Sequence, residues 1–131
     1  MRNSSNKILD GFDPSAIDRA ATSLRNDQLV AIPTETVYGL GARASSPSAI
    51  AKIFEVKKRP KNHPLILHIA DKNDLGKWSQ NISDSARALT TNFWPGPLTV
   101  VVKRNSSVSD LITGNRDTVA IRCPAHSVTT A

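Results

Sequence analysis

The sequence contains little of what marks several protein classes. Its 131 residues include one cysteine, Cys123, so no internal disulfide can form and a disulfide-stapled scaffold is excluded. Aromatic residues make up 5% of the chain, which leaves few platforms on which single-stranded bases could stack. The uncharged apolar runs are far shorter than the ~20 residues that a membrane-spanning helix needs. We therefore expect residues 1–131 to form one soluble domain in a reducing, cytoplasmic compartment.

Several catalytic signatures are missing as well. The sequence has no glycine-rich phosphate loop of the Walker or dinucleotide type and no G-x-S-x-G nucleophile motif. His63 and His126 are isolated, and no group of Cys, His and Asp has the spacing of a metal site. We predict no metal ligand and no catalytic nucleophile. An enzyme with this sequence would act by positioning its substrates and neutralising their charge.

Positive charge is concentrated in one stretch. Lys and Arg number 17 against 11 Asp and Glu, which gives a net charge of +6. Residues 43–68 hold six of these bases and one acid, so +5 of the +6 lies there. Such a cluster favours phosphate groups as partners, from a nucleotide or from a nucleic-acid backbone. A solvated helix end would explain the same run without any partner.

The hydrophobic pattern alternates between helices and strands. Asp13-Pro14, Ser46-Pro47 and Ser83 are typical helix starts. We expect helices over 14–26, 47–58, 71–78 and 83–93, and strands over 29–32, 65–69, 98–102 and 118–122. In the last of these helices, Ala86, Leu89 and Phe93 share one face. The order predicts an α/β (α+β) fold in which helices cover a sheet.

Residues 33–41, P-T-E-T-V-Y-G-L-G, follow one of the expected strands. Their hydroxyl side chains, Thr34 and Tyr38 among them, could bind a ligand that the two glycines allow to approach the backbone. A hydrogen-bonded turn explains the same composition, and spacing alone slightly favours the turn.

Residues 57–64, K-K-R-P-K-N-H-P, combine bases with prolines. In an extended stretch Lys57 and Arg59 would point to the same side and could hold one polyphosphate, Arg59 through its planar fork and Lys57 as a point charge. A basic helix end followed by a proline-broken loop fits the spacing equally well.

Two further residues lie in or beside expected strands. His68 falls within 65–69, where a single histidine is more often a hydrogen-bonded core residue than a ligand contact. Cys123 follows the strand at 118–122 and is most simply a small buried hydrophobe.

Five motifs stand in a fixed order along the chain. They are P-T-E-T-V-Y-G-L-G at 33–41, K-x-R-P-x-x-H-P-L at 57–65, L-H-I at 67–69, W-P-G-P-L-T at 94–99 and T-V-A-I-R-C-P at 118–124. This series resembles the YrdC-like family, the threonylcarbamoyl-AMP synthases, from about Leu29 to the C-terminus. The resemblance implies a YrdC-like twisted mixed β-sheet flanked by helices. It also favours the functional interpretation of residues 33–41 and 57–64.

The resemblance implies a nucleotidyltransferase. Such an enzyme joins L-threonine, bicarbonate and ATP into threonylcarbamoyl-AMP and releases diphosphate, and Mg²⁺ would accompany ATP as the cofactor. A downstream threonylcarbamoyl transferase would use the product to modify the adenosine beside the anticodon of a subset of tRNAs.

Carried over position by position, the resemblance implies two groups of site residues. L-threonine would be bound by Thr34, Tyr38, His68 and Arg122, and the arginine would take the carboxylate, which a bidentate fork suits. The nucleotide would be bound by Lys57, Arg59, Asn62 and Thr118.

The family pattern continues past the strand at 118–122 into a helix and then a strand with an S-x-N motif, which has no counterpart after Arg122. We therefore expect a single YrdC-like domain over 1–131 that lacks its C-terminal part, including most of a helix capped by Ser127. The same expectation predicts a weak or inactive synthase.

Two other functions stay open. One is a module that binds double-stranded RNA or tRNA through the cationic stretch. The other is a paralogue without synthase activity, or a carbamoyl-transfer relative from hydrogenase maturation. Salt separates the first from a nucleotide site, because RNA affinity falls with a log–log slope of about −0.7 to −0.9 per phosphate contact. The sequence does not fix the oligomeric state.

Overall fold

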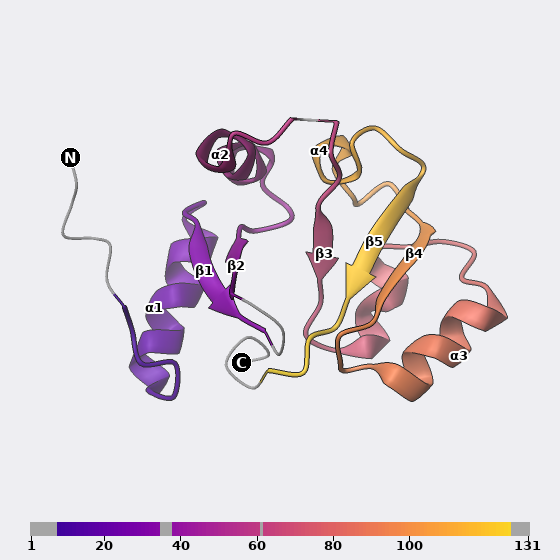
Figure 1. Cartoon of the computed structure of the whole chain (residues 1–131), viewed down its shortest axis with the longest axis horizontal. Coiled ribbons are helices and arrows are strands. Elements are labelled where there is room, and N and C mark those ends of the chain that lie inside the picture. The colour runs from indigo at the N-terminus through magenta and orange to yellow at the C-terminus, as the bar shows by residue number, and fades with distance from the viewer. Residues whose placement is uncertain (1–7, 35–37, 61, 127–131) are drawn as a thin grey trace.

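The computed structural model describes residues 8–34, 38–60 and 62–126. The middle of the threonine-rich segment, Lys61 and the helix expected after Ser127 lie outside these ranges. The elements are α1 (Pro14–Arg25), β1 (Val30–Pro33), β2 (Tyr38–Gly41), α2 (Pro47–Lys57), β3 (Ile66–His68), the 3₁₀ helix η1 (Lys72–Lys77), α3 (Asp84–Phe93), β4 (Thr99–Lys103), α4 (Asp110–Thr113) and β5 (Thr118–Arg122). Figure 1 shows α2 and α4 at one end of the strands and α3 beside β4.

Local capping signals set the helix starts where the sequence predicts them. The side chains of Asp13, Ser46 and Ser83 each accept a hydrogen bond from a backbone N–H of the first helical turn. Helix α2 ends because Lys58 adopts a left-handed conformation, with φ 51°, two residues before Pro60.

The strands form two sheets. In the larger sheet the order is β3-β5-β4, with β3 parallel and β4 antiparallel to β5. The register pairs His68 with Arg122 and Arg122 with Thr99. The smaller sheet is the antiparallel pair β1-β2.

Hydrophobic packing covers one face of the β3-β5-β4 sheet. The buried strand residues on that face are Leu67, Val100, Val102, Val119 and Ile121. Helices α2 and α4, the 3₁₀ helix η1 and the residue that follows α3 complete this core through Ile50, Phe54, Leu75, Trp94 and Ile112. The mixed sheet with helices on one face confirms the predicted α/β class.

Three details differ from the sequence-based expectations. Tyr38–Gly41 is a strand that was not among the expected strands. The short helix α4 was not expected. On α3, Leu89 and Phe93 are exposed and Thr90 is buried, because Trp94, which follows the helix, fills the core instead. The Trp94 Nε1–H donates to the Leu98 carbonyl at 2.8 Å, which fixes that side chain.

Among the described residues, none of the helices is both long and apolar enough to cross a membrane.

Candidate functional site

Three of the residues predicted to bind L-threonine stand at the carboxyl ends of strands. Thr34 directly follows β1, His68 ends β3 and Arg122 ends β5. Figure 1 shows the arrowheads of these three strands pointing towards the same end of the molecule. Ligands of open α/β sheets bind outside the carboxyl ends of the strands. The parallel pairing of β3 with β5 thus brings His68 beside Arg122, although the two are far apart in the sequence.

Arg122 is held in place by the W-P-G-P turn. The side chain is only 8% exposed, and its Nε–H donates to the Gly96 carbonyl at 3.4 Å. The Gly96 N–H in turn donates to the Cys123 carbonyl at 2.8 Å. A Cβ atom at Gly96 would lie 2.6 Å from the Phe93 carbonyl oxygen, so only glycine fits this turn.

Sequence reasoning gave Gly96 no role, although it is a positioning residue for Arg122. The available signal was a glycine between two prolines directly after a predicted helix. That signal marks a turn, but it does not say which side chain the turn supports.

His68 is exposed, which differs from the expectation of a buried strand residue. The reason is that its side chain lies on the face of β3 opposite to Leu67, and that face is not covered by the helices of the core. The His68 Nδ1 is 3.2 Å from the Ile66 carbonyl oxygen, a hydrogen bond that requires a proton on Nδ1. This bond sets the orientation of the imidazole ring.

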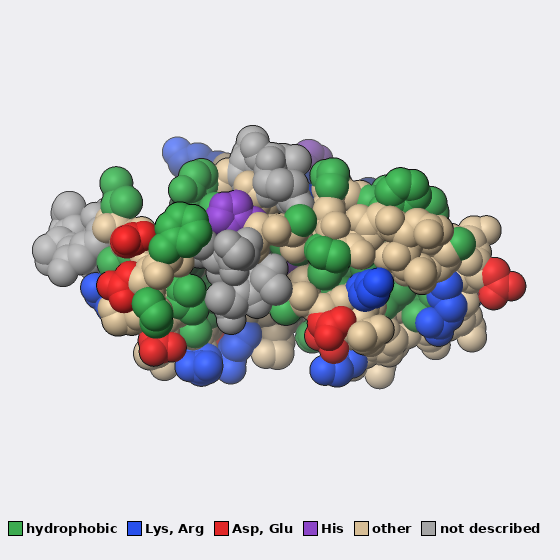
Figure 2. Space-filling model, turned by 90° about the horizontal axis from the view of Figure 1, so that it is seen from below, with side chains coloured by type: hydrophobic (Ala, Val, Ile, Leu, Met, Phe, Trp, Pro, Cys, Tyr) green, Lys and Arg blue, Asp and Glu red, His purple; other side chains and the backbone are tan. Residues whose placement is uncertain are grey.

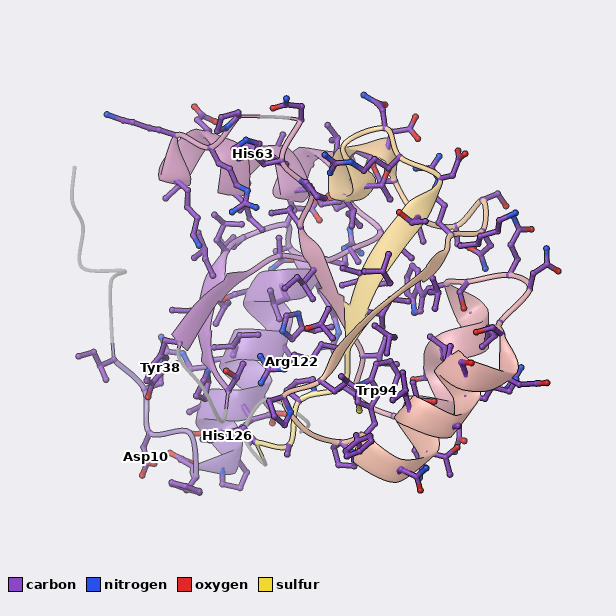
Figure 3. All side chains as sticks on the ribbon, turned by 45° about the vertical axis from the view of Figure 1, so that its right-hand side comes forward. Asp10, Tyr38, His63, Trp94, Arg122 and His126 are labelled. Carbon is purple, nitrogen blue, oxygen red and sulfur yellow. The ribbon has the colours of Figure 1, made fainter. Side chains whose placement is uncertain are left out.

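Tyr38 is the first residue of β2 and pairs with Pro33, which directly precedes Thr34 in the sequence. The register therefore places it at the same end as the carboxyl terminus of β1. In Figure 3, Tyr38, Arg122 and His126 lie towards one end of the molecule, whereas His63 lies near α2 at the other. Figure 2 shows this end from below, with hydrophobic side chains beside a histidine.

The residues predicted to bind the nucleotide occupy the other end of the β3/β5 pair. Lys57, Arg59 and Asn62 precede β3, and Thr118 is the first residue of β5. Four residue steps separate Thr118 from Arg122, or about 13 Å along the strand. The structure therefore divides the eight predicted residues into two groups at opposite ends of the sheet.

Hydrogen bonds fix several of the described residues before β3. The Arg59 Nη2–H donates to the Pro64 carbonyl at 2.8 Å, while the Arg59 Nε is buried without a partner. The Leu65 N–H donates to the Ile112 carbonyl at 2.8 Å, which ties the loop to α4. An extended stretch over 57–59 is not found, because Lys57 is helical and Lys58 is left-handed. The alternation of side chains in an extended strand therefore cannot place Lys57 and Arg59 on the same side of the chain.

Part of the cationic stretch is used for internal contacts. The Arg43 Nη2 forms an ion pair with the Asp27 carboxylate at 2.8 Å, and the Lys52 ammonium donates to the Asp27 carbonyl at 2.8 Å. Hydrogen bonding from Ser46 and then from Arg43 holds the pKa of Asp27 below its ordinary value, against an opposing effect of desolvation. These bases link the end of α1 to α2, which leaves fewer of them to meet phosphates.

Metal binding has little support from the protein side. Within 8–34, 38–60 and 62–126, no group of three or more His, Cys, Asp or Glu side chains could hold an ion. Mg²⁺ commonly keeps several waters and is bound through substrate phosphates. That Mg²⁺ accompanies ATP therefore stays a prediction.

A mixed sheet with helices packed on one face defines an α/β domain. Residues 22–131 match the family model Sua5_yciO_yrdC, described as Telomere recombination. The chain belongs to this family.

Curated relatives of similar sequence are named threonylcarbamoyl-AMP synthase, and a solved structure of similar fold is named Sua5. The chain is 50% identical over 109 residues to a threonylcarbamoyl-AMP synthase of Pyrococcus abyssi, and 44% identical over 120 residues to one of Bacillus subtilis. It superimposes with a TM-score of 0.87 and 44% identity on P. abyssi Sua5 complexed with L-threonine, covering 95% of this chain and 36% of that one.

The matches cover most of this chain but little of the relatives. They span 83% and 91% of the chain, and 32% and 34% of the P. abyssi and B. subtilis proteins. The chain thus spans about a third of the length of these relatives.

Proposed function

We propose that this chain is the L-threonine-recognising part of a threonylcarbamoyl-AMP synthase. The observation that carries the proposal is the pairing of His68 with Arg122 at the carboxyl ends of β3 and β5, with Arg122 held by Gly96. The likeness to a structure described as complexed with L-threonine supports the choice of amino acid. Thr34 and Tyr38 would complete this end of the site.

The amino-acid end would work through charge and shape. The guanidinium of Arg122 would bind the carboxylate of L-threonine, because a planar fork matches a carboxylate. Its burial would strengthen that interaction, since the local dielectric is lower than that of water. The hydroxyl of Thr34 and the ring of His68 would then orient the rest of the amino acid.

The reaction follows from the proposed substrates. The amine of L-threonine and bicarbonate give a carbamate and water. A carbamate oxygen then attacks the α-phosphorus of ATP, the bond to the β-phosphate oxygen breaks, and diphosphate leaves. The carbamate is a weak nucleophile, so positioning is the main contribution that the chain can make. Mg²⁺, bound with ATP, would neutralise charge on the leaving diphosphate.

Lys57, Arg59, Asn62 and Thr118 stay predictions as nucleotide contacts. The ATP-binding role, a cytoplasmic location and transfer of the product to tRNA through a downstream threonylcarbamoyl transferase belong to the same proposal.

Calorimetric titration of L-threonine tests the proposal. We expect binding that Arg122→Lys weakens by about tenfold to a hundredfold, because the charge stays but the fork is lost. The matched control is Arg116→Lys, a substitution at an exposed arginine, which should leave the affinity unchanged. Absence of L-threonine binding by the unaltered, folded chain would refute the proposal.

RNA binding is the second candidate, supported by the charge of residues 43–61. The internal contacts of Arg43 and Lys52 with Asp27 argue against it. Titration of a tRNA at several salt concentrations decides the matter. A steep fall of affinity with salt, together with no response to L-threonine, would favour RNA binding.

A further inference from the structure

Helix α4 and the turn after it lie against the residues that lead into β3. The Leu65 N–H donates to the Ile112 carbonyl at 2.8 Å, so a backbone hydrogen bond joins the two segments. The second contact is between Gly114 and Asn62, because a Cβ atom placed on Gly114 would lie 2.7 Å from the Asn62 carbonyl oxygen. The turn after α4 therefore meets residues 62–65, which we call loop 62–65.

Gly114 occupies a position where a side chain conflicts with the backbone in two ways. Its φ of 62° lies in the left-handed region, which residues with a Cβ rarely adopt. Cβ atoms are essentially never found within 3.0 Å of another such atom, and here the opposing oxygen belongs to the backbone of Asn62. A side chain at this position must therefore displace either the turn or loop 62–65.

The turn is the more firmly held of the two segments. Thr113 is 1% exposed, and its hydroxyl oxygen accepts a hydrogen bond from Arg104 Nη1–H at 2.9 Å. The Arg104 Nη2 also forms an ion pair with the Asp110 carboxylate at the start of α4. Asn62, in contrast, is exposed. Because exposed backbone with few buried contacts moves at a lower cost in free energy, a Cβ on Gly114 would displace loop 62–65.

Displacement of loop 62–65 would move two of the residues proposed to bind the nucleotide. Asn62 belongs to the loop, and the Arg59 Nη2–H donates to the Pro64 carbonyl at 2.8 Å. A misplacement of about 1 Å in a binding group can cost ~10²-fold in rate. His68 and Arg122 stand at the opposite ends of β3 and β5, so the residues proposed to bind L-threonine would stay in place.

We infer that Gly114 is a positioning residue for nucleotide binding. It keeps loop 62–65 where Arg59 and Asn62 can contact the phosphates, and it does not touch the nucleotide itself. This inference rests on the proposed function, since it takes Arg59 and Asn62 as nucleotide contacts. It adds a determinant of nucleotide affinity that lies outside the five sequence motifs.

The test compares Gly114→Ala with Asn115→Ala. Asn115 has a φ of 65°, so both substitutions place alanine in the left-handed region and both should lower the melting temperature. Only Gly114→Ala adds an atom against the Asn62 carbonyl, because Asn115 already has a Cβ. ATP and L-threonine are titrated calorimetrically into each variant, well below its melting temperature.

Gly114→Asn is the second variant, and it keeps the test possible if Gly114→Ala does not fold. Asparagine tolerates the left-handed region better than alanine does, so this variant should lose less thermal stability. It still carries the Cβ that meets the Asn62 carbonyl. We therefore expect it to lose as much ATP affinity as Gly114→Ala.

We expect Gly114→Ala to weaken ATP binding about tenfold, the effect of losing about one hydrogen bond to a charged group. Its affinity for L-threonine should stay within about twofold, and Asn115→Ala should leave both affinities within that range. In the Asn62→Ala background, Gly114→Ala should cost less ATP affinity, because one contact through which it acts is already lost.

Three outcomes would overturn the inference. The first is a Gly114→Ala variant, or Gly114→Asn in its place, that binds ATP as tightly as Asn115→Ala does. The second is an equal loss of affinity for ATP and L-threonine, which would show a general loss of structure. The third is an unaltered chain that binds L-threonine but not ATP, which leaves the L-threonine part of the proposed function standing.

Failure of the proposed function gives a different result. If the unaltered chain binds ATP but not L-threonine, the proposed function is refuted. The difference in ATP affinity between Gly114→Ala and Asn115→Ala then still decides whether Gly114 positions loop 62–65.

Discussion

The two faces of the β3-β5-β4 sheet are built from the same strands but by different rules. On the covered face, apolar residues from helices and strands pack together, with Ile121 fully buried. On the open face, the register sets polar and apolar residues in rows. The covered face contributes the buried apolar contacts that stabilise the fold, and the other face carries residues that we propose bind ligands. Because successive side chains of a strand point to opposite faces, the same short strand contributes residues to both faces.

The sharpest way to test this comparison is to truncate adjacent residues on β4. Val102 lies on the covered face and Val101 on the open face. We expect Val102→Ala to lower the free energy of unfolding by about 2–3 kcal/mol, through lost burial and the cavity left behind. Val101→Ala should change it by no more than ~0.5 kcal/mol. Denaturant titration measures both, and equal effects would contradict the assignment of the faces.

A substitution in the W-P-G-P turn tests whether this turn positions Arg122. Because a Cβ at Gly96 would meet the Phe93 carbonyl at 2.6 Å, we expect Gly96→Ala to displace the turn and cost about 1–2 kcal/mol. L-threonine affinity should fall as well, since the Gly96 carbonyl orients Arg122.

Gly76→Ala is the matched control for this change. A Cβ at Gly76 has no atom within 4 Å, so neither stability nor L-threonine affinity should fall. A Gly96→Ala variant that binds L-threonine normally would show that the turn does not position Arg122.

Arg59 and Lys57, which precede β3, should differ less from each other in their effect on stability. Arg59 is half-buried and donates to the Pro64 carbonyl, whereas Lys57 is exposed. We expect Arg59→Ala to lower stability by about 1 kcal/mol, and Lys57→Ala by no more than ~0.5 kcal/mol. Both should weaken ATP binding. Thermal melts and calorimetry measure the two effects, and unchanged ATP affinity in both variants would remove them from the nucleotide site.

The smallest expected effect concerns Asp27, which follows α1. Its pKa in the folded chain lies below the ordinary 3.8, so the unfolded chain binds more protons between these two values. The stabilising contribution is therefore complete above the ordinary pKa and is lost as the pH falls through the folded pKa. Asp27→Asn should flatten the stability profile in acid, compared with Asp18→Asn on exposed α1. Identical profiles for the two variants would contradict the assignment.

Local chemistry in the sequence determined the longer helices and most strands. Asp13, Ser46 and Ser83 cap helices at the predicted positions, because a cap depends only on a side chain and the backbone just after it. The strand at 118–122 is found with the predicted bounds. The ordered motifs also identified the family.

Only the tertiary structure decided which residues meet. The pairing of His68 with Arg122 depends on the parallel register of β3 and β5, and the support of Arg122 by Gly96 depends on where the W-P-G-P turn packs. The exposure of Ile66 and Val101 depends on which face the helices cover. Each of these is set by contacts between segments that are distant in the sequence, which periodicity and capping do not encode.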